Sequence, residues 1–406
     1  MKLIHTIMVF VLGLCTMQVN AQTMRVYSNQ VITAIPSASA GDIIIEEGGK
    51  AFSVMGNHFN VADVQQIIVD RSTFPTNSVQ VDYLGEKAQI TVSADIAPQL
   101  NIRVTDAHVC VLVEPTFLTE VNYTLGGTSA NGSFYMDSNF KSSLTLNNLN
   151  LTNPDSAAIN IASGKRLAVN LPEGTTTTLT DAHNKLHKAC FFVNGHAEFS
   201  GSGTLNLRGN SRHAYASDEY SWFKPGFGTL NVTSALGDGM HIEQYLRIQD
   251  GSFNISGTQG DCIDVQSKLR KVLELNGQAF VNGGTLNLQV KADDTKGLKC
   301  DSIMTISGGH ITALVAGNGS KGISAGTDLY LNDYSGTAPL IKMDVTGSTY
   351  MPGDPLLQAK CRGIKVKRNF IFDGGNIHMT VTGNKAKGIS VDGETQYFKG
   401  SSNVPW

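Results

Sequence analysis

The chain has 406 residues, of which 42 are glycine and 11 are proline, and its formal net charge at pH 7 is −3. A balance this close to neutral gives no sign of a nucleic-acid or anionic-membrane partner, because both need a strong basic excess. Beyond the N-terminal segment no apolar run approaches the length of a membrane-spanning helix. The frequent glycines and the recurring pairs N-G, G-G and D-G are typical of many short strands joined by tight turns.

Residues 1–21 have the composition of a secretion signal. Lys2 supplies a positive start, residues 3–14 are largely apolar, and Ala21 ends a plausible cleavage site. Cys15 raises the alternative of lipid attachment, but that processing needs a small residue before the cysteine and here it is a leucine. We therefore expect an exported protein that is periplasmic, attached to the cell surface or extracellular.

Residues 22–132 contain strand-like stretches at uneven spacing, such as MRVYSN, VITAIP, VQVDYL and AQITVSA. Their alternation of apolar and polar residues indicates a half-buried sheet. We expect a β-rich cap or small domain, which would cover strand edges at the end of the more regular region that follows.

Residues 133–406 are more orderly. Short segments such as LTLNNLNL, GTLNV, GTLNL and HITALVA alternate apolar and polar residues and are separated by Gly, Asn or Asp. Residues with helical periodicity are nearly absent, and 181–189 is the best candidate for one short helical turn. The segment lengths predict strands throughout.

A fixed register runs through this region. Glycine followed by an apolar residue recurs, with Cys262 once in the glycine slot, and the preceding residues are Asp238, Asp261, Lys296, Lys321, Arg362 and Lys387. Their spacings are 23, 35, 25, 41 and 25 residues. A period of about 20 to 25 residues that carries several short strands predicts one turn of a solenoid. The two longer spacings predict inserted loops near 266–275 and 334–360, which would protrude and frame a groove.

Stacked turns would form parallel sheets around a continuous apolar column, because a single turn cannot bury its inward residues alone. Alternate residues, such as Leu286 and Leu288 or Ile377 and Met379, should point inward. Leucine-rich repeats have a similar period, but their L-x-x-L-x-L-x-x-N series and helices are missing, and a β-sandwich would not keep the register. The sequence therefore predicts an all-β fold, a parallel β-helix with an N-terminal β-rich cap.

Three runs in this register resemble a known family. They read GDGMHIEQYLRIQDGSFNISGTQGDCIDV, KGLKCDSIMTISGGHITALVAGNGSKGISAG and RGIKVKRNFIFDGGNIHMTVTGNKAKGISVDG. The pattern is similar to that of the secreted bacterial carbohydrate-binding β-helix family, whose turns repeat (D/K)-G-I-x-x-x-x-x-x-I-x-G-G-x-I, and the resemblance covers 143–393. It implies a pectate-lyase-like, right-handed helix that contains calcium and binds acidic (polygalacturonate) or cellulosic polysaccharide without demonstrated catalysis.

The resemblance also implies where calcium would be held, because family members often have Asp before the register glycine. Here only Asp238 and Asp261 keep it, while Asp264 falls near them in register and Asp294 and Asp301 flank the next turn. Calcium takes six to eight oxygen ligands, so these five acids are the expected ligands. The alternative is that an Asp in a turn only accepts hydrogen bonds from its own backbone. No spacing typical of a transition-metal site is present, and the ten histidines are scattered.

Two groups of residues are candidates for polysaccharide contact. Stacking should place equivalent residues about 4.8 Å apart along the axis, which aligns four cations in one basic row: Lys296, Lys321, Arg362 and Lys387. Such a row could pair with the carboxylates of an acidic polysaccharide, and the alternative is that these are solvated side chains. Trp222 and Tyr220 are the best aromatic platforms for sugar rings, with packing beneath a loop as the alternative.

Five cysteines follow residue 21, an odd number without a C-x-x-C pair. Three of them, Cys190, Cys262 and Cys300, lie within apolar strand patterns. We interpret the cysteines as buried free thiols, and the alternative is a disulfide whose partners the spacing does not name.

The sequence contains no complete catalytic set. It lacks a G-x-S-x-G elbow, a P-loop and a dinucleotide fingerprint, and the N-T-D, G-H-G and R-I-K signatures of polygalacturonases are missing. Asp293-Asp294 is a carboxylate pair, and a lyase could use Arg362, Lys365 or Lys367 as its base. We expect non-catalytic polysaccharide binding. The alternatives are a lyase that acts on uronate polymers and a structural or adhesive surface protein.

Overall fold

The computed structural model describes residues 22–184, 186–268, 274–334, 336–350 and 358–403. The expected secretion signal and parts of both expected loop insertions lie outside these ranges. The described chain is all-β, and its helical segments are three short 3-10 turns, at Ser37–Ser39, Glu47–Gly49 and Ala97–Gln99. The helical turn expected within 181–189 is therefore not found in the part of this stretch that is described. None of the described helices has the length and apolar character that would let it cross a membrane.

The N-terminal strands form a small antiparallel unit with its own core. Its strands are β1 (Thr23–Ser28), β2 (Val31–Pro36), β3 (Ile44–Glu46), β4 (Ala51–Val54), β5 (Asn57–Asn60) and β6 (Val64–Asp70). β1 pairs with β2 and β6, whereas β3, β4 and β5 make a separate sheet. Val26, Ile35 and Phe52 belong to an apolar cluster distinct from the main core.

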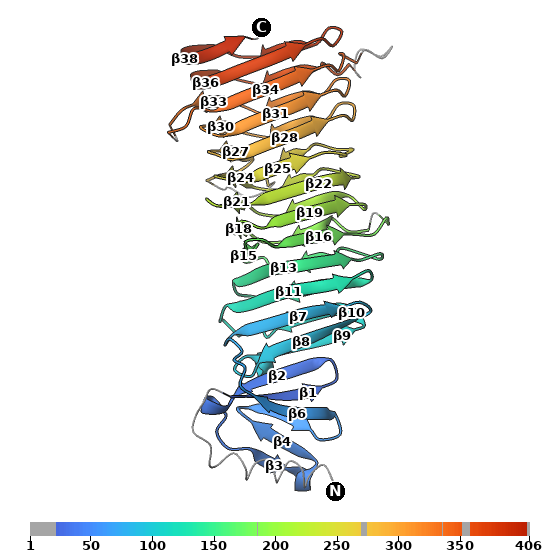
Figure 1. Cartoon of the computed structure of the whole chain (residues 1–406). Helices are drawn as coiled ribbons and strands as arrows, with labels where there is room; N and C mark the ends of the chain where they lie inside the picture. Colours follow the sequence, from blue (N-terminus) through green and yellow to red (C-terminus); the bar gives the residue numbers. More distant parts are fainter. Residues whose placement is uncertain (1–21, 185, 269–273, 335, 351–357, 404–406) are drawn as a thin grey trace.

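Five strands lead from this unit into the long stack of Figure 1: β7 (Ser78–Leu84), β8 (Lys87–Ser93), β9 (Leu100–Thr105), β10 (Ala107–Val113) and β11 (Val121–Ser129). β7 already pairs in parallel with β11, and its buried residues belong to the main core. The transition is gradual, because β7–β8 and β9–β10 still pair antiparallel and β2 pairs in parallel with β8 within the same sheet. Residue 132, the expected boundary, is the first residue of β12 (Gly132–Asp137), which pairs in parallel with β10.

The remaining strands fall into three parallel ladders. Ladder 1 contains β16 (Thr176–Thr180), β19 (Thr204–Gly209), β22 (Thr229–Ala235), β25 (Ser252–Ile255), β28 (Thr285–Val290), β31 (His310–Val315) and β34 (Leu340–Val345). Ladder 2 contains β15 (Leu167–Asn170), β18 (Ala197–Ser200), β21 (Ser221–Phe223), β24 (Tyr245–Ile248), β27 (Gln278–Val281), β30 (Met304–Ile306) and β33 (Leu329–Asn332). β13 (Ser142–Thr152) and β36 (Phe370–Val381) pair with both ladders, and β38 (Thr395–Asn403) follows β36.

Ladder 3 is a separate sheet. After β9, β10 and β12 it contains β14 (Ile159–Ile161), β17 (Ala189–Val193), β20 (His213–Ser217), β23 (Met240–Ile242), β26 (Ile263–Val265), β29 (Lys296–Cys300), β32 (Lys321–Ala325), β35 (Arg362–Val366) and β37 (Lys387–Val391). Between β14 and β34 the chain visits ladders 3, 2 and 1 in turn, so each set of three successive strands forms one unit of the stack.

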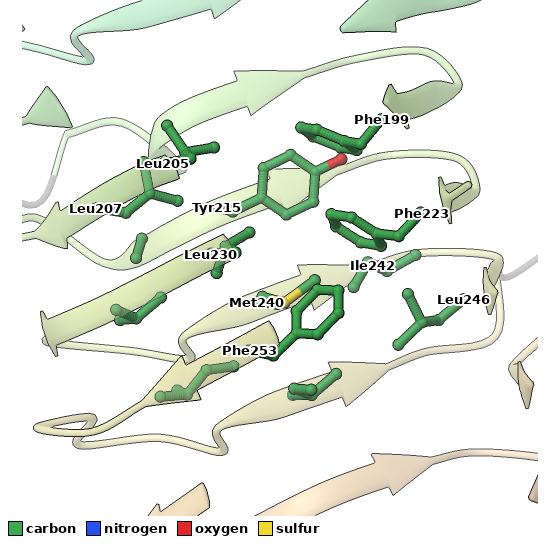
Figure 2. Packing of buried hydrophobic residues seen from close by; sticks show 14 of the residues in the cluster. Phe199, Leu205, Leu207, Tyr215, Phe223, Leu230, Met240, Ile242, Leu246 and Phe253 are labelled. Carbon is green, nitrogen blue, oxygen red and sulfur yellow. The ribbon is translucent and has the colours of Figure 1, made fainter. Parts of the chain in front are cut away.

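The core lies between the ladders and follows the alternation of the strands. Leu286, Leu288, Ile377 and Met379 are buried, as the alternation predicts. One apolar cluster extends from Val79 to Ile389. Figure 2 shows its middle part, where phenylalanine and leucine side chains from successive units stack on one another. This stacking makes the core continuous, because each unit covers the inward residues of the one before it.

The glycines of the register serve two different purposes. The glycine that precedes the apolar residue lies where two units approach closely: a Cβ at Gly297 would lie 2.5 Å from the carbonyl oxygen of Gly322, and one at Gly322 would lie 2.8 Å from that of Gly363. The glycines that precede ladder 1 strands lie where the chain turns from one sheet to the next. Gly284 and Gly309 have φ values of 78° and 76°, which residues with a side chain rarely adopt. The expectation that glycines permit bends between sheets holds for this second group.

The described cysteines are free thiols. Cys190, Cys262, Cys300 and Cys361 are buried and Cys110 is partly exposed. Burial raises the pKa of Cys262 and Cys300 to about 12, so both stay protonated at neutral pH. The interpretation as packed thiols is confirmed for these residues.

The stacked phenylalanines give a test of the core. The ring of Phe223 lies 4.6 Å from that of Phe199 and 4.8 Å from that of Phe253, between centroids. Replacing Phe223 with Ala should lower the free energy of unfolding by about 3 to 5 kcal/mol, because a buried cavity replaces a ring packed on both sides. Urea denaturation measures the loss. The outward Thr229→Ala substitution is the control, and a loss at Phe223 no larger than at Thr229 would contradict this description of the core.

Candidate functional site

A single row of side chains runs along the outer face of ladder 3. It contains the six residues that precede the register marks and continues one unit further toward the N-terminus: His213, Asp238, Asp261, Lys296, Lys321, Arg362 and Lys387. Lys296 is the register partner of Lys321, and Arg362 is that of Lys387. The predicted alignment of these positions is therefore confirmed, and the row changes from acidic to basic along the stack.

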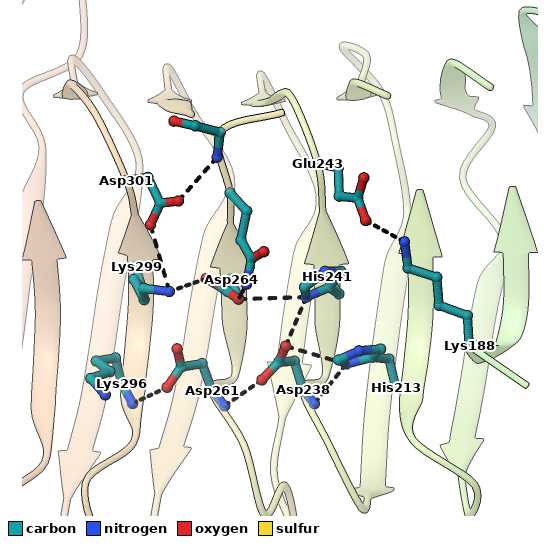
Figure 3. Close-up of polar contacts among 12 residues, drawn as sticks. Lys188, His213, Asp238, His241, Glu243, Asp261, Asp264, Lys296, Lys299 and Asp301 are labelled. Atoms are coloured by element: carbon teal, nitrogen blue, oxygen red, sulfur yellow. Dashed lines mark hydrogen bonds and ion pairs between the residues drawn. The ribbon is translucent and has the colours of Figure 1, made fainter. Parts of the chain in front are cut away.

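The acidic part of the row is a connected cluster (Figure 3). Asp238 Oδ2 lies 2.9 Å from His241 Nδ1 and 3.2 Å from His213 Nδ1. His241 Nδ1 also lies 3.4 Å from Asp264 Oδ2 on the next strand. Asp238 Oδ1 accepts the backbone N–H of Asp261 at 2.8 Å. Four polar side chains from β20, β23, β26 and the turns before them thus meet beneath a largely closed surface.

Burial and these contacts shift the ionisation of the cluster. Burial opposes the charged form of Asp238, but hydrogen bonds from His213 and His241 hold its pKa well below the usual range. Burial would lower the pKa of His241, yet its hydrogen bonds to Asp238 and Asp264 raise it to about 9. Burial lowers the pKa of His213. At neutral pH the cluster therefore contains a charged His241, a neutral His213 and ionised Asp238.

Asp261 differs from its neighbours. Burial raises its pKa to about 6, although the charge of Lys296 acts in the opposite direction. Its Oδ1 accepts the backbone N–H of Lys296 at 2.7 Å. The negative charges of Asp238 and Asp264 add to the effect of burial, so one carboxyl of this group keeps its proton well above the pH at which an exposed Asp ionises.

The five expected calcium ligands are not all brought together. Oxygens of Asp238, Asp261 and Asp264 lie within 4.8 Å of one another. Asp294 lies apart from them and pairs with Lys321 at 3.0 Å. Asp301 is separated from the group by Lys299, which lies 2.8 Å from Asp264 and 3.7 Å from Asp301. The structure thus gathers three of the five carboxylates.

The basic part of the row is only partly open to a ligand. Lys296 Nζ and Lys321 Nζ lie 3.6 Å and 3.0 Å from the same oxygen of Asp294, so two cations share one carboxylate. Lys387 is exposed. Arg362 is only 7 % exposed and its Nη1 donates to the carbonyl of Cys361. The prediction that Arg362 pairs with a polymer carboxylate is therefore wrong, because its guanidinium is buried and donates a hydrogen bond to the backbone of the protein itself.

The aromatic residues proposed as platforms lie on the outer face of ladder 2. The ring of Tyr220 stacks on His196 at 4.4 Å and on Tyr245 at 4.7 Å, between centroids. Cations lie over Trp222, with Lys224 Nζ at 5.1 Å from its ring centre. In a parallel ladder equivalent side chains stack face to face, so the faces of Tyr220 are covered and it is not an open platform for sugar rings. Its hydroxyl donates to Glu198 Oε1 at 2.8 Å.

Sequence reasoning missed the two histidines of the cluster. His213 lies 25 residues before Asp238, so extending the register by one unit would have found it. His241 lies in register with Asp264, and Asp264 in turn with Lys299, in a second outward row parallel to the first. The histidines looked scattered because residues 28 positions apart in the chain become neighbours only through stacking.

Ladder 1 presents a face of a different kind. From β16 to β28 two adjacent outward rows contain only uncharged polar residues: Thr176, Thr204, Thr229, Ser252 and Thr285 in one, and Thr178, Asn206, Asn231, Asn254 and Asn287 in the other. Each asparagine amide from β22 to β28 donates to the asparagine of the preceding unit at 2.8 Å. These hydrogen bonds fix the side chains in one regular array.

The raised pKa of Asp261 predicts a pH-dependent stability. Its pKa rises from 3.8 to about 6 on folding, so the folded protein holds this proton more tightly than the unfolded chain. The stabilisation is present below about pH 4 and is lost as the pH rises through about 6. Asp261→Asn mimics the protonated acid, and should therefore be more stable than the wild type at pH 7.5, by up to about 3 kcal/mol, and equal to it below pH 4.

Urea denaturation in EDTA at several pH values measures this difference. Asp294→Asn is the control, because the pKa of the exposed Asp294 is lowered by its lysine partners despite some burial and its loss should not stabilise the protein at neutral pH. A difference for Asp261→Asn that does not change between pH 4 and 7.5 would refute the assignment.

Comparison with known proteins adds to this geometry. A protein of Acetivibrio thermocellus (strain ATCC 27405), described as a carbohydrate-binding domain-containing protein, is 27% identical over 131 residues, which are 30% of this chain and 42% of that protein. The chain thus spans less than half the length of this relative. A solved structure titled as that of the polysaccharide lyase-like protein from C. thermocellum, a gadolinium derivative, is 18% identical and covers 80% of this chain and 98% of its own, with a TM-score of 0.39.

A family model described as carbohydrate-binding domain-containing protein matches residues 109–338. This range includes β12 to β32 and with them both the acidic cluster of ladder 3 and the uncharged array of ladder 1. Because the match covers more than half of the chain, the protein belongs to the family of carbohydrate-binding domain-containing proteins.

Proposed function

We propose that this protein is an exported, right-handed parallel β-helix that binds polysaccharide on its outer faces without cleaving it. The three ladders, visited in a constant order, are the expected faces of such a helix, and the composition of residues 1–21 supports export. Family membership supports a carbohydrate ligand. The faces differ in charge, so we assign each its own class of polymer.

The principal ligand is an acidic polysaccharide at the basic end of ladder 3. The observation that carries this assignment is the register of Lys296, Lys321 and Lys387 in one outward row. Successive strands are spaced by about 4.8 Å, so Lys296 and Lys321 lie one strand spacing apart and Lys387 lies two spacings beyond Lys321, with the buried Arg362 between them. The strand spacing is comparable to the repeat of sugar residues in an extended chain. A uronate polymer carries one carboxylate on each residue and would meet these ammonium groups in sequence.

The basic part of the row has more positive charges than nearby carboxylates. Lys296 and Lys321 share Asp294, and the exposed Lys387 lies further along the same row. Exposed ion pairs contribute little individually, so binding needs several of them along one polymer chain. The proposed affinity therefore comes from the length of the row and should fall as the salt concentration rises.

Calcium has no place in this proposal. The oxygens of Asp238, Asp261 and Asp264 already accept hydrogen bonds from backbone N–H groups, histidines and Lys299. The same cluster contains imidazole nitrogens, whereas calcium prefers oxygen ligands alone. The donor set therefore fits calcium poorly, and polymer retention should not depend on it.

The geometry does not favour a lyase. Arg362 is buried, and the Lys365 ammonium pairs with Asp392. Lys367 is exposed, at the end of β35. None of these three candidate bases contacts the acidic cluster near His241, so the arrangement of base and carboxylates that a lyase would need is not assembled from them.

A second candidate function is binding of a neutral polysaccharide, such as cellulose, on ladder 1. The uncharged rows of threonine and asparagine favour it, because they offer hydroxyl and amide groups in a flat, regular array. The hydrogen-bonded asparagines are already ordered, so less conformational entropy is lost when a regular surface binds them. A charged polymer would find no counter-charge on this array.

The basic row can be tested by charge reversal. The double variant Lys321→Glu with Lys387→Glu should bind polygalacturonate about tenfold more weakly, since two ion pairs of up to ~1 kcal/mol each are replaced by repulsion. Affinity electrophoresis in gels that contain the polymer measures retention. Lys87→Glu with Lys342→Glu makes the same charge change at exposed positions elsewhere. Equal retention of both double variants, with unchanged melting temperatures, would remove the row from the proposal.

The ladder 1 array can be tested by one bulky, charged substitution. Thr229→Arg places a long side chain in the middle of the uncharged rows and should abolish most retention on insoluble cellulose while leaving polygalacturonate binding unchanged. Thr305→Arg is the matched control, because Thr305 occupies an outward position on ladder 2. Pull-down with microcrystalline cellulose measures both, and an equal effect of the two variants would disprove the assignment of this face.

A further inference from the structure

We propose that the outward side chains at β24 form a binding site for the carboxylate of an acidic sugar, with Arg247 as its central residue. β24 pairs with β21 and β27 in ladder 2 (Figure 1), on a different face from the basic row. This inference rests on the proposed function, to which it adds a second contact for a uronate polymer. Leu246 and Ile248 are buried in the core. The alternating residues Tyr245, Arg247 and Gln249 therefore point outward.

Arg247 is a cation without an anionic partner in the described part of the chain. Its guanidinium donates no hydrogen bond to a described residue, and its Nε atom is buried without an acceptor. Glu198 lies two strands earlier in the same outward row, but its carboxylate pairs with Lys224 at 2.8 Å and accepts the Tyr220 hydroxyl. That carboxylate therefore does not compensate the charge of Arg247, which remains open to an anion from outside.

Two aromatic rings hold the guanidinium in place. Arg247 is the register partner of Trp222 on β21 and of Phe280 on β27, so it lies between the two rings. Its Cζ atom is 5.9 Å from the ring centre of Trp222 and 5.2 Å from that of Phe280, and both rings attract the cation. The side chain is thus ordered before a ligand arrives, and little conformational entropy remains to be lost on binding.

The outer end of the guanidinium keeps its hydrogen-bond donors for a ligand. Nε is the only nitrogen of Arg247 that is both buried and unpaired, so Nη1 and Nη2 stay accessible. Two such nitrogens form a rigid fork that matches the two oxygens of a carboxylate. The position of Arg247 between two rings directs this fork away from the core, toward a polymer that lies on ladder 2.

The two neighbours of Arg247 along the chain supply further donors. Trp222 Nε1 donates to Gln249 Oε1 at 2.6 Å, which fixes the amide and leaves its nitrogen as a donor without an acceptor among the described residues. Burial raises the pKa of Tyr245, so its hydroxyl keeps its proton at neutral pH. N–H and O–H donors therefore flank the guanidinium on both sides.

This set of donors favours a uronate over a neutral sugar. A uronate supplies a carboxylate for the fork of Arg247 and hydroxyl or ring oxygens for the donors beside it. A neutral sugar supplies only the second kind of acceptor and leaves the guanidinium without a counter-charge. The site should therefore select acidic chains.

Trp222 is a reporter inside the proposed site. The chain has two tryptophans, so Trp406→Phe leaves Trp222 as the only one. Trigalacturonate added to this parent chain should change the fluorescence of Trp222 saturably, because a carboxylate at Arg247 changes the charge beside the indole. It should also protect Trp222 from quenching by iodide, which tests the site without any change to it. Maltotriose, a neutral trisaccharide, should have neither effect.

Two substitutions of Arg247 in this parent chain test its role. Arg247→Gln should weaken trigalacturonate binding about tenfold, because a charge-assisted bidentate pair is lost. Arg247→Lys keeps the charge but not the fork, and should still weaken binding at least about threefold. Arg103→Gln removes the same charge at an exposed position on β9 and should bind like the parent.

The absence of a saturable response, an equal response to maltotriose, or equal affinity of Arg247→Gln and Arg103→Gln would overturn the site. Lys321→Glu with Lys387→Glu should leave the Trp222 response unchanged, because the basic row lies on another face. Retention on polygalacturonate without a Trp222 response would remove this site alone. Loss of both in the parent chain would remove the proposed binding of acidic polysaccharide as well.

Discussion

The parallel pairing of successive units determines almost everything else in this protein. Because each strand pairs in register with the strand one unit later, equivalent residues fall into straight rows about 4.8 Å apart. Inward rows become a continuous apolar core, and outward rows become stripes of like chemistry. Gly297 and Gly322 show how strict the constraint is, since a Cβ at either would meet the backbone of the next unit.

This constraint also decides what each outward residue can do. Stacking covers the ring faces of Tyr220 with His196 and Tyr245, which removes an aromatic platform that the sequence suggested. The same stacking brings His213 and His241 together around Asp238. Side chains in such rows find their partners mainly in the units before and after them.

The three faces consequently differ in chemistry. Ladder 3 changes from an acidic, histidine-containing cluster to a basic row, whereas ladder 1 presents uncharged threonine and asparagine rows. Such separation on one rigid stack would let a single chain contact a charged polymer and a neutral surface at different positions. The uncharged array is held by the asparagine hydrogen bonds, and the cluster near His241 by ion pairs across units.

The sequence by itself determined the strands, the register and the single row that includes Asp238, Lys296 and Lys321, because the alternation of apolar residues and the spacing of glycines are local and periodic. It did not determine the burial of Arg362 or the gathering of His213 with His241. Those features depend on which units lie next to one another and on how side chains share the space between them. Only the tertiary structure decides this, since stacking joins residues that are one or more units apart in the chain.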